Sequence, residues 1–247
     1  MPVKDFKNLL NPSTYHTTSF LPEDYSSKVN IYDFAGHYSL YHDGWYGSMV
    51  LVYDSGQFHG TYNHVRDDRA YKVTASVDEQ HPYQITFIIH KFNQNIPTDQ
   101  VFTGYLFAHG KNAIAGQTTW RGQPFGFFAR KSGFLHLSDY GDGSESVLPK
   151  HFAGSYSLYH DGQPATLELA ESNSLLMSGI YRRNGVTQEV VARVSSKVPH
   201  EITISIYMET GEFVLLTGYL FTRPKNAIAG YMKWGETQSG FYMIKYS

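Results

Sequence analysis

The chain has 247 residues, 41% of them hydrophobic, with a formal net charge of −2 and no cysteine. This length and composition are enough to bury a core, and 16% aromatic against only 17% charged residues favours strands over helices. The missing cysteines exclude disulfides and thiolate metal sites, and the lack of a basic excess argues against nucleic acid as a partner.

The first 30 residues have no counterpart elsewhere in the chain, and we interpret residues 1–30 as an N-terminal arm. They lack the continuous apolar core of a secretory signal, and no stretch of the sequence approaches the ~18 apolar residues of a membrane span. The sequence therefore predicts a soluble, cytoplasmic protein with no membrane partner.

The rest of the chain is an internal duplication. FAGHYSLYHDG at 34–44 recurs as FAGSYSLYHDG at 152–162, and TGYLFAHGKNAIAG at 103–116 recurs as TGYLFTRPKNAIAG at 217–230. A period this long indicates a duplicated domain, since about 100 residues can enclose a core alone.

The stretch between the two copies is rich in Gly, Ser and Asp, which is typical of an exposed linker. We predict a first domain at 31–132, a linker at 133–148 and a second domain at 149–247.

Short strand patterns, separated by Gly, Asp, Asn and Pro, follow one another through each copy, seven or eight to a copy. No segment shows a helical period over twelve residues. Consecutive strands with tight turns favour an up-and-down meander, and closing it into a barrel removes its exposed edges. The predicted fold class is all-β, with two tandem antiparallel up-and-down β-barrels related by duplication.

The order of short motifs in each copy resembles the avidin and streptavidin family. The residues that carry the resemblance are Gly36-His37-Tyr38, Gly60-Thr61-Tyr62, Phe102-Thr103-Gly104-Tyr105, Thr118-Thr119-Trp120 and Gly126-Phe127-Phe128. The resemblance covers nearly the whole of each copy. It implies a calycin-type barrel, avidin-like or lipocalin-like, that holds a small molecule in its lumen.

The family's pocket can be carried across position by position. Its third-strand Tyr is kept as Tyr62 and Tyr181, and one Trp is kept as Trp120 and Trp234. Its Ser becomes His64 in the first copy and Arg183 in the second, while another Trp becomes Phe102 or Leu216.

Biotin itself is not the expected ligand. The urea-binding Asn of the family falls at Leu40 and Leu158, and its late Asp falls at Gly126 and Gly240. A buried urea left unpaired costs about 1–3 kcal/mol per group, which is enough to erase tight affinity.

If Tyr38 faces the lumen as its family counterpart does, the alternation of a strand turns Leu40 and His42 inward too. Tyr62 and His64 are expected to face the same lumen. His42, His64, Tyr38 and Tyr62 then form a candidate catalytic group for an isomerase, lyase or cyclase that needs no cofactor. Alternatively, these side chains satisfy one another in a polar barrel interior. The two histidines lack a carboxylate third ligand, so no metal is predicted.

Residues expected to contact a ligand lie in both copies. They are Leu40, Phe102, Thr118, Trp120, Tyr156, His160, Tyr181, Arg183 and Trp234. The tryptophans and neighbouring phenylalanines have a second interpretation as barrel floor and outer packing.

Two further repeated motifs have structural interpretations. Asp43-Gly44 and Asp161-Gly162 are favoured two-residue hairpin turns. The repeated Lys-Asn-Ala-Ile-Ala-Gly at 111–116 and 225–230 predicts a turn and a small-residue strand where another strand or subunit approaches closely. A homo-oligomer therefore stays open as a partner.

Three functions remain open from the sequence. The first is binding of an aromatic or hydrophobic small molecule in the lumen of the first domain. The second is a cofactor-free isomerase, cyclase or lyase of a biosynthetic pathway, by fold-level analogy with tandem lipocalin-like cyclases. The third is a lectin with two similar sites. Because His64 is replaced by Arg183 in the second copy, the two lumens cannot share one acid–base task, and the first copy is predicted to be the working one.

Overall fold

The computed structural model describes residues 29–66, 69–93, 96–131, 133, 135, 137, 146–208, 211 and 213–246. The N-terminal arm predicted at 1–30 lies almost wholly outside the described residues, and so does most of the predicted linker at 133–148.

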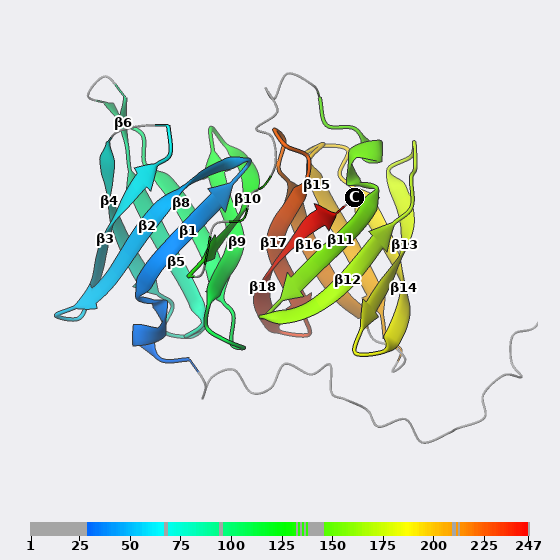
Figure 1. Ribbon diagram of the computed structural model, residues 1–247, viewed down its shortest axis with the longest axis horizontal. Helices are drawn as coiled ribbons and strands as arrows, with labels where there is room; N and C mark the ends of the chain where they lie inside the picture. The colour runs from blue at the N-terminus through cyan, green and yellow to red at the C-terminus, as the bar shows by residue number, and fades with distance from the viewer. Residues whose placement is uncertain are drawn as a thin grey trace, which may run out of the picture.

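The first copy forms a closed antiparallel barrel of eight strands in the order β1-β10-β9-β8-β5-β4-β3-β2 (Figure 1). Its strands are β1 (Gly36–His42), β2 (Trp45–Asp54), β3 (Gln57–His64), β4 (Ala70–Val77), β5 (Gln84–His90), β8 (Gln100–Leu106), β9 (Ala113–Trp120) and β10 (Gln123–Arg130). A small hairpin of β6 (Phe92–Asn93) and β7 (Ile96–Pro97) lies between β5 and β8.

The second copy forms a second closed barrel, whose eight strands follow the chain order from β11 to β18. They are β11 (Gly154–His160), β12 (Gln163–Leu169), β13 (Leu176–Arg183), β14 (Val186–Val194), β15 (Glu201–Tyr207), β16 (Phe213–Leu220), β17 (Ala227–Trp234) and β18 (Thr237–Tyr246). The predicted fold class, two tandem antiparallel barrels related by duplication, is confirmed.

A short 3₁₀-helix precedes the first strand of each barrel: η2 (Ile31–Phe34) and η3 (Pro149–Phe152). The Tyr38 hydroxyl donates to the Phe34 carbonyl at 2.8 Å, and the Tyr156 hydroxyl donates to the Phe152 carbonyl at 2.7 Å. Both phenylalanines are fully buried, so each helix plugs one end of its barrel. In the described part of the chain, no helix has the length and apolar character needed to cross a membrane.

The first strand shows how the barrel interior is filled. Tyr38, Leu40 and His42 are all buried, as expected for alternate residues that face one lumen. Tyr41 breaks the alternation because it is buried on the opposite face, where its ring stacks on Phe128 at 4.8 Å. The outer face of this strand is therefore covered as well.

The second barrel covers this outer face of the first. Strands β9 and β10 face β17 and β18 across the middle of the molecule (Figure 1). A Cβ built on Gly126 would lie 2.2 Å from the Ala229 carbonyl oxygen, and one on Gly240 would lie 2.5 Å from the Ala115 carbonyl oxygen. The two sheets meet at backbone contact distance, which confirms the close approach predicted for the repeated small-residue strand.

Both Asp-Gly pairs form the predicted hairpin turns. Their backbones have positive φ, at 46° and 79° for Asp43 and Gly44 and at 51° and 79° for Asp161 and Gly162. These angles match a two-residue turn with left-handed conformation at both positions. Each turn therefore sits at the strand end that carries His42 or His160.

Candidate functional site

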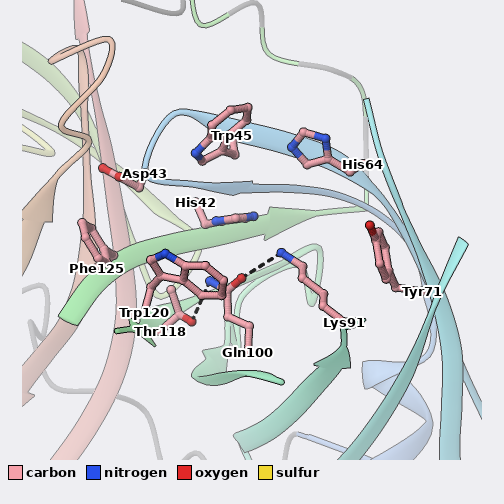
Figure 2. A pocket seen from close by; sticks show the side chains of 10 residues that line it. All are labelled: His42, Asp43, Trp45, His64, Tyr71, Lys91, Gln100, Thr118, Trp120 and Phe125. Carbon is pink, nitrogen blue, oxygen red and sulfur yellow. Dashed lines mark hydrogen bonds between the residues drawn. The ribbon is translucent and has the colours of Figure 1, made fainter. Parts of the chain in front are cut away.

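A cavity of about 350 Å³ opens at the mouth of the first barrel, at the end opposite η2. Figure 2 shows the side chains that surround it, which come from most of the strands of this barrel. Tyr38 is not among the lining residues, since its hydroxyl is committed to the plugged end.

Aromatic rings form much of the cavity wall. Trp45 at the start of β2 lies 5.2 Å from His64 at the end of β3, ring centroid to ring centroid. Trp120 ends β9, and Phe125 in β10 stacks at 4.8 Å on His200 of the second barrel. The walls are therefore apolar surfaces held in place from both barrels.

A chain of hydrogen-bonded polar side chains runs along one side. The Lys91 ammonium donates to Gln100 Oε1 at 3.0 Å, and the Gln100 amide donates to Thr118 Oγ1 at 3.2 Å. The Thr118 hydroxyl donates in turn to the Val101 carbonyl at 2.7 Å. Gln100 and Thr118 are buried, so this chain has a fixed geometry and presents a cation at its open end.

His42 lies at the floor of the cavity. Its Nε2 is 3.5 Å from the Tyr62 hydroxyl, and its ring meets Phe102 edge-on at 5.5 Å. Burial, with the nearby Lys91 charge as a smaller cause, holds the pKa of His42 well below 6.5. Burial also raises the pKa of Tyr62. Both side chains are therefore neutral at physiological pH.

The second barrel has the same His-Tyr pair at the floor of its lumen as the first barrel, but different residues at its mouth. His160 Nε2 lies 2.8 Å from the Tyr181 hydroxyl, and Arg183 also hydrogen-bonds Tyr181. Burial lowers the pKa of His160 to about 3, with smaller contributions from Arg183 and His109. The His-Tyr pair is thus a shared feature of both lumens.

Among the residues that the structure describes, the polar chain has no counterpart at the second mouth. Equivalent register positions place Val214 where the first barrel has Gln100, and Met232 where it has Thr118. Met208 follows β15 as Lys91 follows β5. These three apolar side chains pack against the core of the second barrel, so the two mouths differ in chemistry.

The structure separates the residues singled out from the sequence into several groups. His42, His64, Thr118 and Trp120 line the cavity. Tyr62 and Phe102 lie beneath its floor, and Leu40 is deeper in the core. In the second barrel, Tyr156 lies at the plugged end, while His160, Tyr181 and Arg183 form one cluster and Trp234 ends β17 as Trp120 ends β9.

Sequence reasoning missed Trp45, Tyr71, Lys91 and Gln100, which belong to none of the repeated motifs. A signal was present in the sequence. The strand registers pair these residues with Gln163, Gln188, Met208 and Val214, so the signal was a set of differences between the two copies that alters polarity or size at one end of the barrel. Within the described residues, no three His, Asp or Glu side chains come together as a metal site would require.

Comparisons with known proteins add little to this geometry. No family model matches the chain, and no curated protein matches it. Among solved structures, the chain is similar to a protein of unknown function from the DUF3598 family of Nostoc punctiforme, with 8% identity and a TM-score of 0.30 over 92% of this chain and all of that one. A likeness this weak carries no functional argument.

Proposed function

We propose that this protein binds a small, largely aromatic molecule in the mouth of its first barrel. The observation that carries the proposal is the cavity of about 350 Å³, which has aromatic walls and a fixed polar chain on one side. Pockets for small molecules are typically concave, mostly apolar and equipped with a few placed polar groups. The volume is at the lower end of their usual range, which suits a molecule of up to three aromatic rings with short substituents.

The pKa values of His42 and Tyr62, the side chains at the cavity floor, favour binding over acid–base catalysis. A general base works best when its pKa lies near the operating pH, and the pKa of His42 is far below that. The raised pKa of Tyr62 makes it a poor proton donor in the same way. His42 and Tyr62 are better suited to orient a ligand through neutral contacts than to exchange its protons.

A lectin with two similar sites would require equivalent mouths in both barrels, and the geometry of the two mouths fits this less well. Lys91, Gln100 and Thr118 have Met208, Val214 and Met232 as counterparts, so the described part of the second mouth has no such polar chain. The proposal therefore assigns ligand binding to the first barrel and leaves the second barrel a structural role.

The resemblance to avidin and streptavidin supports this proposal, because proteins of that family are calycin-type barrels that hold their ligand in the lumen. Biotin is not the proposed ligand. Leu40 is fully buried in the apolar core, and Gly126 is pressed against Ala229 of the other barrel, so neither position offers the lumen a partner for a urea.

Native mass spectrometry of freshly purified protein tests the proposal. The expected result is a co-purified molecule of small mass at a stoichiometry of one per chain. A matched control closes the mouth with side chains that this fold already accommodates: Gln100→Val with Thr118→Met reproduces Val214 and Met232 of the second barrel.

The control protein is expected to lose the bound molecule while keeping its circular dichroism spectrum. The reverse pair in the second barrel, Val214→Gln with Met232→Thr, is expected to retain it. Equal retention of the molecule by both double variants would place the ligand elsewhere and overturn the proposal.

A further inference from the structure

The mouth of the first barrel gathers positive charge. The Lys91 ammonium lies 5.8 Å from the centre of the Trp120 ring, and the Arg121 guanidinium flanks the same ring at 5.8 Å. The Arg66 guanidinium lies 5.3 Å from the Trp45 ring. The chain as a whole carries a net charge of −2, so this concentration of cations is a local feature of the mouth.

The second barrel supplies a further cation to the same place. Arg223, in the turn between β16 and β17, lies 4.5 Å from the centre of the Trp45 ring, closer than Arg66. Its Nε is buried and makes no hydrogen bond within the described residues. Gly44 packs against the adjacent Pro224, where a Cβ would approach to 2.5 Å, so this turn is fixed on the rim.

Negative charge is scarce among the lining residues. Asp43 is the only acid that lines the cavity in the described part of the chain. It is turned to the second barrel, where it accepts hydrogen bonds from the backbone amide and the hydroxyl of Thr222. Its carboxylate accepts these hydrogen bonds from neutral donors and its charge offsets part of that of nearby Arg223, while the Lys91 ammonium donates to Gln100 instead.

The second mouth shows that this charge is not a general property of the barrel. The counterparts of Lys91 and Arg121 there are Met208 and Gly235, and the counterpart of Trp45 is Gln163. The second mouth thus keeps a tryptophan, Trp234, and has Arg183 where the first has His64, but it has no tryptophan or cation at the positions of Trp45, Lys91 and Arg121.

Resting on the proposed function, we propose that the ligand of the first mouth is an aromatic acid, with its ring between the tryptophan-bearing walls and its anionic group on Lys91. Figure 2 shows the Lys91 ammonium directed toward the middle of the cavity, held by Gln100. A cation fixed at the edge of an apolar pocket attracts an anion more strongly than one in open water, because solvent screens it less. The cavity of about 350 Å³ is of a size to hold the ring system of such an acid.

Two fluorescent probes that share one ring system test the ligand class. 1-Anilinonaphthalene-8-sulfonate carries an anionic group, and N-phenyl-1-naphthylamine is its neutral analogue. In titrations of the full chain, the sulfonate is expected to bind about 10-fold more tightly or better, and its advantage is expected to shrink as salt screens the charges.

Lys91→Met places the residue of the second barrel at the first mouth. It is expected to remove most of the sulfonate's advantage while changing the affinity of the neutral probe less than about 2-fold. Lys91→Arg keeps the charge and is expected to restore the preference. Met208→Lys, the matched change in the second barrel, is expected to leave both affinities unaltered.

The outcomes separate the two proposals. If both probes bind the wild type equally, or if Lys91→Met weakens both equally, the mouth binds aromatic molecules without selecting acids and the inference is overturned. If the double variant Gln100→Val with Thr118→Met binds the neutral probe as the wild type does, the mouth is not the site and the proposed function itself fails.

Discussion

Asp43 of the first barrel caps Thr222 of the second. Its carboxylate accepts a hydrogen bond from the Thr222 backbone amide at 2.6 Å and another from the Thr222 hydroxyl at 3.0 Å. The duplicate makes the reciprocal contact, with the Ala108 amide of the first barrel donating to Asp161 at 2.7 Å. Two copies of one domain thus meet through the same surface, related by an approximate two-fold axis.

This contact predicts that Asp43→Ala destabilises the protein by about 2–3 kcal/mol, because it removes two buried hydrogen bonds and places alanine at a positive φ. Asp43→Asn keeps a residue that tolerates this conformation and one acceptor oxygen, so about 1 kcal/mol is expected. Urea unfolding at neutral pH measures both variants. Equal losses in the two would show that the turn conformation contributes nothing.

At the contact between the two barrels, adding a methyl group is predicted to lower stability, the opposite of its usual effect. Glycine to alanine in a compatible backbone usually stabilises slightly. Gly126→Ala is expected to destabilise by about 1–3 kcal/mol instead, because the new methyl group meets the Ala229 carbonyl oxygen and no side-chain rotation relieves the clash.

Gly240→Ala should behave similarly against Ala115. Thr119→Ala, at an exposed position of β9, serves as the control and is expected to be nearly neutral. Thermal unfolding compares the three, and a neutral Gly126→Ala would mean that the barrels are not in fixed contact.

The barrel itself was predictable because its signals are local. Tyr38, Leu40 and His42 follow the two-residue period of a strand, and Asp43-Gly44 marks the turn that ends it. Tyr41 illustrates what a strand period cannot reveal. It stacks on Phe128 and hydrogen-bonds the Leu135 backbone within a cluster that includes residues of both barrels, and this cluster forms only when the two finished barrels pack together.

The candidate site was predictable only in part, for a similar reason. His42 was found because it lies inside a repeated motif, and His64 because it falls at the Ser position of the avidin family. Lys91 and Gln100 belong to no motif, and they converge only once β5 and β8 pair across the hairpin that separates them in sequence. The role of Asp43 between the barrels was also missed, since the turn alone accounts for an Asp at that position.

The buried His160 predicts acid sensitivity. Its pKa in the folded protein is about 3, chiefly through burial, whereas an unfolded histidine titrates near pH 6.5. Because the pKa of His160 is lower in the folded than in the unfolded protein, the neutral His160 contributes its full stability above about pH 6.5. That stability is lost as the pH falls from about 6.5 toward 3, where the unfolded chain binds a proton that the folded chain does not.

At pH 4.5 the expected loss from this one group is roughly 2–3 kcal/mol relative to pH 7. Urea unfolding of the wild type and His160→Gln at both pH values isolates it, because the carboxylates titrate alike in the two proteins. The variant is expected to lose less stability on acidification. Identical losses would contradict a lowered pKa at His160.

Binding at the first mouth predicts unequal roles for the two shared histidines. His42→Ala is expected to weaken binding of 1-anilinonaphthalene-8-sulfonate by about 1–3 kcal/mol, because the floor of the cavity loses a neutral polar contact. His64→Ala on the wall should act in the same direction. His160→Ala changes the other lumen and should leave the affinity unaltered. Equal losses from His42→Ala and His160→Ala would favour two equivalent sites.

The polar chain predicts strong coupling between Gln100 and Thr118. Thr118→Met alone leaves the buried Gln100 amide without its acceptor, and Gln100→Val alone removes a partner of both Lys91 and Thr118. Each single change is expected to cost about 1–3 kcal/mol, the penalty of an unsatisfied buried group.

The double variant removes donor and acceptor together and installs the pair that the second barrel buries as Val214 and Met232. Its loss of stability is therefore expected to be smaller than the sum of the two single losses by about 1 kcal/mol or more. Urea unfolding of the four proteins of the cycle measures this coupling energy. Strict additivity would mean that the two side chains do not depend on each other, and that the rigidity ascribed to the Lys91 end of the chain has another origin.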